Sequence, residues 1–439
     1  MAGSRIRFGT DGVRGEANST LLPEHALRLG LAAARTLGRR VCIGRDTRLS
    51  GGMLSCALAA GLASGGTEVL DLGVLPTPAV AALAPELGMD AAGVVSASHN
   101  PYPDNGIKFF SGEGVKLSEE QERELERLAA GEFPERPVGS GVGGVRTVED
   151  AAGMYVEGVL SRLDPDAGGR RILLDCANGA ACETAPLAFE RLGADFGLVA
   201  AEPDGTNIND GCGSTHIGDL DPSGYDVAFA FDGDADRVLA LDERGGVVDG
   251  DRIIAILARD LAERGQIGGG VVVTVMSNLG FFKAMERLGI PCEVVPVGDR
   301  YVAEAMRRTG AAVGGEQSGH VIVSRYSKTG DGLVTALALL EVMERSGMPL
   351  YELAGVMEVY PQTLINVPVG GADAGEVCGS EEVRRAVEEA RRRLGDEGRI
   401  LLRPSGTEPV VRVMVEHLDE RVCTEVCEEV AEVVAGVRC

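Results

Sequence analysis

Three consecutive parts of the 439-residue chain repeat one pattern, in which short apolar stretches alternate with helical stretches and the last apolar stretch runs into a polar loop. The apolar stretches are residues 41–43, 67–72 and 91–95, then 172–175, 196–200 and 226–231, then 271–275, 292–297 and 311–313. Apolar runs of this length between helices are typical of layered α/β folds. The repeat therefore predicts three similar mixed α/β domains.

After about residue 360 the pattern changes. Expected strands at 363–369 and 410–415 flank a charged helix at 381–394, which indicates a smaller α+β domain. We therefore expect four domains, with the boundaries 1–145, 146–250, 251–360 and 361–439.

Each of the three copies ends its last apolar stretch in an unusual polar loop, at residues 96–101, 232–237 and 315–320. In open α/β sheets, ligands bind beyond the carboxyl ends of the strands. Three such loops facing one another would form a single composite site.

Asp232, Asp234 and Asp236 alternate directly after an apolar stretch. Carboxylates at alternate positions of an extended loop can direct oxygens to one hard cation such as Mg²⁺, so the spacing predicts a metal site. The spacing also fits a calcium-binding EF-hand loop, with Glu243 at its last position. Arg237 stands where that loop needs glycine for its sharp turn, which argues against calcium.

Ser98 ends another apolar stretch and has His99 beside it. A serine there can be a covalent nucleophile if a base or metal activates it, although a capped turn would use the same residue types. Neighbouring side chains do not face each other, so His99 is not necessarily the base. Lys108 follows in a chain with only four lysines among 42 basic residues. The pKa of a lysine, unlike that of an arginine, can be lowered enough for proton transfer.

Near the C-terminus, Arg403, Ser405, Gly406 and Thr407, with Arg412 five residues beyond the last of them, combine guanidinium groups, hydroxyls and flexible backbone N–H groups. This set favours a phosphate-binding loop, with a plain turn as the alternative.

Glu316, Ser318 and His320 share a loop bounded by glycines, without metal-ligand spacing, and offer donors and acceptors suited to sugar hydroxyls. Arg14 supplies a further guanidinium within the glycine-rich segment 8–15.

The chain carries 67 acidic and 42 basic residues, a net charge of −25. Such a charge argues against nucleic-acid and membrane-surface partners, since both are polyanionic. A phosphorylated small molecule would need a local cationic pocket. No apolar run approaches the roughly 18 residues of a membrane span, and the ten cysteines are scattered. We expect a cytoplasmic protein, either monomer or homodimer.

Five motifs, in order along the chain, resemble those of the α-D-phosphohexomutase superfamily. They are Gly-Thr-Asp-Gly-Val-Arg at 9–14, Ser-Ala-Ser-His-Asn-Pro at 96–101, Asp-Gly-Asp-Ala-Asp-Arg at 232–237, Gly-Glu-Gln-Ser-Gly-His at 315–320 and Arg-Pro-Ser-Gly-Thr-Glu-Pro at 403–409. The resemblance implies four domains around a central active-site cleft, three of them alike.

The resemblance also implies a role for each candidate residue. Ser98 would be phosphorylated in the resting enzyme, with hexose 1,6-bisphosphate as the source of that phosphate. Mg²⁺ would be bound by Asp232, Asp234, Asp236 and the phosphate on Ser98. The remaining implied roles are sugar-hydroxyl binding by Glu316 and Ser318, binding of the non-reacting phosphate by Arg403, Ser405, Gly406, Thr407 and Arg412, proton transfer by Lys108 and His320, and charge stabilisation by Arg14, Arg237 and Arg300.

With Gln317, the motif at 315–320 resembles that of the phosphoglucosamine mutase branch, since phosphomannomutase and phosphoglucomutase enzymes usually carry methionine at this position. This favours interconversion of glucosamine 6-phosphate and glucosamine 1-phosphate, with a phosphomannomutase or phosphoglucomutase as the alternative. A non-catalytic sugar-phosphate sensor on the same scaffold is the alternative from another class.

Overall fold

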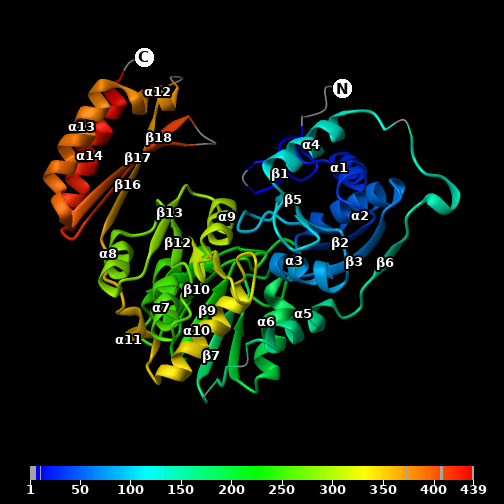
Figure 1. Cartoon of the computed structure of the whole chain (residues 1–439), viewed down its shortest axis with the longest axis horizontal. Helices are drawn as coiled ribbons and strands as arrows, with labels where there is room; N and C mark the ends of the chain where they lie inside the picture. The colour runs from blue at the N-terminus through cyan, green and yellow to red at the C-terminus, as the bar shows by residue number, and fades with distance from the viewer. Residues whose placement is uncertain are drawn as a thin grey trace. The chain divides into compact units, whose positions relative to one another are not determined.

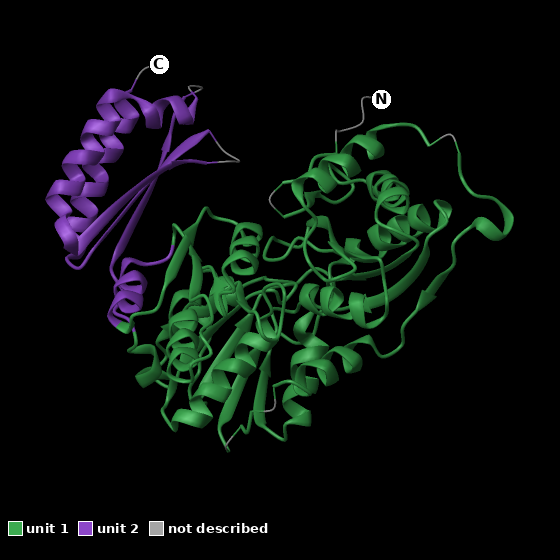
Figure 2. Ribbon diagram, viewed as in Figure 1, with its two compact units in different colours: residues 1–276, 288–356 green, residues 277–287, 357–439 purple. Residues whose placement is uncertain are grey.

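The computed structural model of the chain (Figure 1) describes residues 6–9, 11–133, 135–163, 165–167, 169–370, 373–405 and 409–437. It divides into two compact units, residues 1–276 with 288–356 and residues 277–287 with 357–439 (Figure 2). Three mixed sheets lie in the first unit and one antiparallel sheet lies in the second. The predicted fold class is therefore confirmed.

The first sheet has six strands in the order β1-β5-β4-β2-β3-β6, of which β4, β2, β3 and β6 run parallel. Its strands are β1 (Val13–Glu16), β2 (Arg40–Arg45), β3 (Glu68–Val74), β4 (Ala91–Val95), β5 (Asp104–Ser111) and β6 (Val145–Thr147). The helices of this part are α1 (Pro23–Thr36), α2 (Leu49–Ser64), α3 (Thr77–Glu86) and α4 (Glu119–Ala130).

The second and third sheets are ordered β11-β10-β9-β7-β8 and β13-β12-β14-β15. Their strands are β7 (Arg171–Asp175), β8 (Asp195–Val199), β9 (Val227–Phe231), β10 (Val238–Asp242), β11 (Val247–Val248), β12 (Val271–Thr274), β13 (Cys292–Val295), β14 (Val313–Gly315) and β15 (Val321–Val323). The helices are α5 (Ala151–Leu160), α6 (Ala181–Arg191), α7 (Gly250–Glu263), α9 (Asp299–Thr309), α10 (Gly332–Ser346) and α11 (Leu350–Ala354).

The same arrangement recurs in all three sheets. A central strand (β2, β7 or β12) pairs in parallel with two neighbours, and one of these (β4, β9 or β14) is followed by an antiparallel strand (β5, β10 or β15). The three polar loops are the connections into those antiparallel strands. Strands β4 and β9 are buried along their whole length, which is why they read as unbroken apolar runs.

The second unit contains a sheet ordered β16-β18-β17 with helices packed against it. Its elements are β16 (Gln362–Pro368), β17 (Gly398–Pro404), β18 (Val410–His417), α8 (Leu279–Leu288), α12 (Ala374–Gly379), α13 (Glu381–Leu394) and α14 (Glu420–Gly436). Residues 277–287 belong to this unit because the buried Glu416 carboxylate accepts hydrogen bonds from Asn278 Nδ2 at 3.3 Å and from the Leu279 N–H at 3.0 Å. None of the described helices combines the length and the apolar character that crossing a membrane requires.

Asp331 ties two parts of the first unit together. Its Oδ1 accepts from the Val334 N–H at 3.0 Å, capping α10, and from the Tyr155 hydroxyl of α5 at 2.8 Å. Burial raises the pKa of Asp331 to about 6 from an ordinary 3.8. The folded state therefore binds this proton more tightly than the unfolded state, and stability is lost as pH rises from about 4 to 6.

We expect Asp331→Asn to stabilise the protein at pH 8, because asparagine keeps the acceptor oxygen without the buried charge. The gain is at most roughly 3 kcal/mol, from 1.36 kcal/mol per pKa unit. It should shrink as pH falls below about 6, because aspartic acid is then protonated in the folded state. Thermal unfolding of both proteins at pH 4.5 and pH 8 checks this, and an equal difference at the two pH values would contradict it.

Candidate active site

The three polar loops of the first unit meet through their side chains. Ser98 Oγ, after β4, donates a hydrogen bond of 2.6 Å to Asp232 Oδ2, after β9. His320, which precedes β15, places Nδ1 at 3.6 Å from Asp236 Oδ2. The loops at corresponding places in three sheets thus form one composite site.

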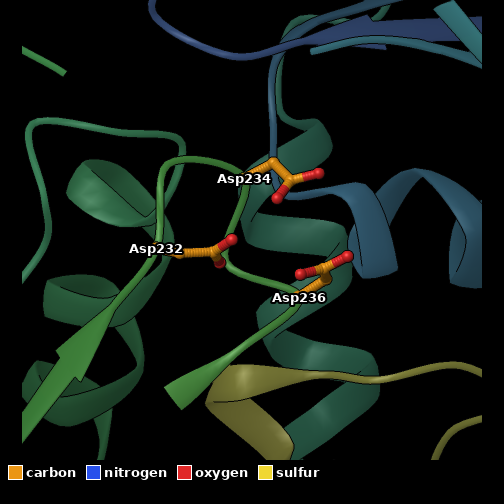
Figure 3. Close-up of side chains that lie close together, drawn as sticks. All are labelled: Asp232, Asp234 and Asp236. Atoms are coloured by element: carbon orange, nitrogen blue, oxygen red, sulfur yellow. The ribbon is translucent and has the colours of Figure 1, made fainter. Parts of the chain in front are cut away.

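The carboxylates of Asp232, Asp234 and Asp236 lie along a single turn between β9 and β10 (Figure 3). All three residues are buried, and each offers an oxygen within 4.8 Å of the others. Ala235 has a φ of 54°, a left-handed conformation that tightens the turn between the second and third aspartates. Alternate positions of one loop are thereby brought to one point.

The buried and mutually repelling carboxylates of this cluster are suited to binding a hard cation. Asp234 Oδ1 and Asp236 Oδ1 are buried without a hydrogen-bond partner among the described residues. Burial raises the pKa of Asp232 well above its ordinary value, and the charges of Asp236 and Asp234 raise it further. Buried carboxylate oxygens that lack donors and repel one another are suited to a divalent cation with a preference for oxygen ligands.

Lys108, on β5, is buried and lies against the same cluster. Its Nζ donates to Asp234 Oδ2 at 2.7 Å and lies 3.7 Å from Asp236 Oδ2 and 3.8 Å from Asp11 Oδ2. Burial lowers the pKa of Lys108, but these three carboxylates outweigh it and raise the pKa overall. The direction is opposite to the lowering that sequence reasoning considered, so Lys108 is cationic in the structure as it stands.

Lys116 and Asp299 extend this network and were not among the predicted site residues. Lys116 Nζ lies 2.5 Å from Asp11 Oδ1 and also contacts the carboxylate of Asp299. Asp299 Oδ2 in turn lies 3.9 Å from His320 Nε2. Asp11 lies in the motif at 9–14, whereas the only sequence signal for Lys116 was the scarcity of lysine, because its partners are distant along the chain.

The hydroxyl of Ser98 is buried, and the residue has a φ of 51°. This left-handed conformation brings Ser98 Oγ to 3.3 Å from His99 Nδ1, contrary to the expectation that neighbouring side chains point apart. Burial, with the charges of Arg237 and Arg14, lowers the pKa of His99 to about 4. His99 is therefore a neutral imidazole near pH 7.

Arg237 and His320 face different oxygens of the Asp236 carboxylate. Arg237 Nε is 3.7 Å from Asp236 Oδ1. The Gly330 N–H donates to His320 Nε2 at 3.1 Å, so in the neutral ring the proton is on Nδ1, facing Asp236. Arg14 approaches the Ser98 loop from β1, with Nη1 donating to Asn100 Oδ1 at 3.1 Å.

Other predicted residues have partners within the protein. Arg300 forms an ion pair of 2.6 Å with Glu122 of α4, and Glu316 Oε1 accepts from the Gly298 N–H at 3.0 Å. Ser318 is exposed. Gln317 Nε2 donates at 3.1 Å to Asp249, the residue that caps α7, so this side chain fixes the loop against a helix.

In the second unit, Arg403 and Arg412 are direct cross-strand partners on β17 and β18. Burial and the charge of Arg412 lower the pKa of Arg403. Like charges directly opposite each other disfavour the sheet, so this pair is suited to an anion. Ser405 follows β17, with its N–H donating to the Val410 carbonyl at 2.9 Å, whereas the predicted Gly406 and Thr407 lie outside the described residues.

Comparison with known proteins matches the chain to all four domain models of one family. Phosphoglucomutase/phosphomannomutase alpha/beta/alpha domains I, II and III match residues 5–135, 153–246 and 249–360, and the C-terminal domain matches residues 364–433.

Two relatives are similar to this chain over nearly its whole length. Phosphoglucosamine mutase of Rubrobacter xylanophilus is 72% identical, covering 95% of this chain and 94% of its own, and that of Moorella thermoacetica is 52% identical, covering 94% and 95%.

Solved structures show the same fold. A phosphoglucomutase/phosphomannomutase family protein from Burkholderia thailandensis superposes with a TM-score of 0.85 at 26% identity, covering 99% of this chain and 98% of its own. The N-acetylphosphoglucosamine mutase of Aspergillus fumigatus, solved with GlcNAc-6P and magnesium, has a TM-score of 0.71 at 18% identity, covering 99% and 97%.

Proposed function

The chain belongs to the phosphoglucomutase/phosphomannomutase family, and from that premise we propose that it interconverts glucosamine 6-phosphate and glucosamine 1-phosphate. One observation supports the chemistry most directly. The buried Ser98 hydroxyl donates a hydrogen bond to Asp232, in a carboxylate cluster where two oxygens have no hydrogen-bond partner among the described residues. The choice of glucosamine is supported by the two relatives, both named phosphoglucosamine mutase.

In the proposed reaction, phosphorylated Ser98 donates its phosphoryl group to the free hydroxyl of the sugar monophosphate. The P–O bond to Ser98 breaks, a P–O bond to the sugar forms, and the sugar hydroxyl loses its proton. The bisphosphate then reorients, so that its other phosphate faces Ser98 and is transferred back to it. Hexose 1,6-bisphosphate would supply the first phosphate.

Transfer of this kind depends on positioning and on neutralising negative charge. We assign Lys108, which is cationic, and His320 to proton transfer. Arg14 and Arg237 are assigned to stabilising the transferring phosphoryl group. Arg300 would reach the phosphate only by leaving Glu122.

We propose that Mg²⁺ is the cation held by Asp232, Asp234, Asp236 and a phosphate oxygen on Ser98. When bound, it would supply positive charge beside the transferring phosphoryl group. Glu316 and Ser318 are assigned to the sugar hydroxyls.

The non-reacting phosphate is assigned to Arg403, Ser405, Gly406, Thr407 and Arg412. We expect Arg403→Gln to raise KM for glucosamine 6-phosphate by about 10- to 100-fold, since hydrogen bonds to charged groups contribute roughly 1.5–3 kcal/mol. Because the substitution also removes one of two opposed charges, the unfolding temperature without ligand should not fall. Arg421→Gln, at an exposed arginine of α14, is the control and should change neither quantity.

Steady-state assays with Mg²⁺ and glucose 1,6-bisphosphate on glucosamine, mannose and glucose 6-phosphates test the proposed function. We expect the highest kcat/KM with glucosamine 6-phosphate. A higher value for mannose or glucose would replace it with a phosphomannomutase or phosphoglucomutase activity. Binding of sugar phosphate without turnover would identify a sensor.

We also place this activity in the cytoplasm. The described cysteines are all free thiols, which suits a reducing compartment.

A further inference from the structure

Arg48, in the connection between β2 and α2, lies beneath the loop that carries Ser98. Its side chain is completely buried, and so is that of its ion-pair partner, Asp46, whose Oδ2 accepts from Arg48 Nε at 2.8 Å. A buried guanidinium is retained only where its N–H groups are satisfied. The remaining N–H groups of Arg48 point to the loop above it.

These N–H groups donate hydrogen bonds to four backbone carbonyls within residues 98–104. Nη2 donates to Ser98 O at 2.7 Å and to Asn100 O at 2.8 Å, and Nη1 donates to Asp104 O at 3.0 Å and to Pro101 O. One side chain thereby fixes both ends of the loop. The carbonyl oxygens, which would repel a phosphoryl group, are turned towards Arg48.

The backbone N–H of Ser98 is held by the same cluster. It donates to Ser96 Oγ at 2.9 Å, and the Ser96 hydroxyl donates to Asp46 Oδ2 at 2.6 Å. A non-glycine residue with a φ of 51° persists only where its surroundings determine the conformation. Arg48 binds the carbonyl of Ser98 directly, and Asp46 acts on its N–H through Ser96. The resulting conformation directs Ser98 Oγ to Asp232.

We propose that Arg48, acting with Asp46 and Ser96, is a positioning residue that sets the attack geometry of Ser98; this rests on the proposed function. Arg48 does not contact the reacting atoms. Its effect is on the rate of phosphoryl transfer, which depends on ångström-level placement, and not on the binding of the sugar phosphate.

The test is Arg48→Lys, which keeps the charge but replaces a planar fork of five donors with an ammonium that has three. Lysine cannot donate hydrogen bonds to the four carbonyls and to Asp46 at the same time. We expect kcat for glucosamine 6-phosphate to fall about 100-fold, while KM stays within about threefold. The rate at which glucose 1,6-bisphosphate phosphorylates Ser98, followed by intact mass, should fall in parallel.

Arg28→Lys is the matched control. Arg28, on α1, also donates to backbone carbonyls, with Nε donating to Ala129 O at 2.5 Å and Nη2 donating to Gly131 O, both at the end of α4, and neither partner is a candidate site residue. We expect it to lower the unfolding temperature at most, with kcat unchanged. An unchanged kcat in Arg48→Lys, a loss confined to KM, or an equal loss of kcat in Arg28→Lys would overturn the inference.

If Arg48→Lys does not fold, Ser96→Ala decides. It keeps both members of the Arg48–Asp46 pair and removes the hydrogen bonds that Ser96 Oγ accepts from the Ser98 N–H and donates to Asp46. We expect kcat to fall about tenfold, as for the loss of roughly 1.4 kcal/mol at the Ser98 N–H. Ser55→Ala is its control, because Ser55 is buried and bonds only Gly52 O within α2 among the described residues. Equal kcat values in the two alanine variants would refute the positioning role. A wild-type protein without mutase activity would refute the proposed function instead.

Discussion

Replacing Ser98 with alanine should abolish mutase activity, lowering kcat by at least about 10⁴-fold, because the covalent acceptor of the phosphoryl group is gone. The fold should be retained, since alanine loses only the hydrogen bonds of one hydroxyl. Coupled-assay rates on glucosamine 6-phosphate, together with intact mass, give the measurement. The wild type treated with glucose 1,6-bisphosphate should carry one added phosphate, and Ser98→Ala should carry none.

Ser346→Ala provides the comparison. Ser346, at the end of α10, donates its hydroxyl to Val342 O at 2.7 Å and lies outside the candidate site, so both its rate and its added phosphate should match the wild type. Persistence of the added phosphate in Ser98→Ala would show that the phosphorylated residue is another one.

Asp232→Asn should separate metal binding from folding. With EDTA, its unfolding temperature should equal or exceed that of the wild type, because one carboxylate leaves a buried cluster of like charges. Asparagine keeps an acceptor for the Ser98 hydroxyl. With Mg²⁺, the wild type should gain stability, by about 2.7 kcal/mol at a hundred times Kd, and the variant should gain little. Activity should fall at least about 10³-fold.

Asp242→Asn is the control for this experiment. Asp242 is also buried, but its Oδ1 accepts from the Arg244 and Gly246 N–H groups at 2.8 Å, in the turn after β10. Its Mg²⁺-dependent stabilisation should match that of the wild type. The metal assignment would be wrong if Mg²⁺ raised the unfolding temperature of Asp232→Asn as much as that of the wild type.

Sequence reasoning located most of the strands of the three repeated domains to within two residues at each end. The stretch 226–231 became β9 (Val227–Phe231), and 91–95 became β4. Strands β1, β5, β6, β11 and β15 were not predicted, and two of these, β5 and β15, show why. The first mixes polar and apolar residues around Lys108, so it lacks an unbroken apolar run. The second is an apolar run of only three residues, shorter than a typical strand.

Local sequence patterns were enough to identify several of the residues that form the candidate site. Ser98 and the three aspartates each follow an apolar strand, and the end of a strand in an α/β sheet is where ligands bind. Arg403 and Arg412 were singled out together, and they face each other because β17 and β18 pair in antiparallel register.

What the tertiary structure alone decided is how these groups change one another. Ser98 and Asp232 are 134 residues apart, and Lys108 and Asp234 are 126 residues apart, yet both pairs are hydrogen-bonded. Local sequence determines which residues end a strand, but charge, burial and donor geometry depend on neighbours brought together by folding. The raised pKa of Lys108, the engagement of Arg300 by Glu122 and the burial of Arg48 beneath Ser98 are therefore visible only in the folded chain.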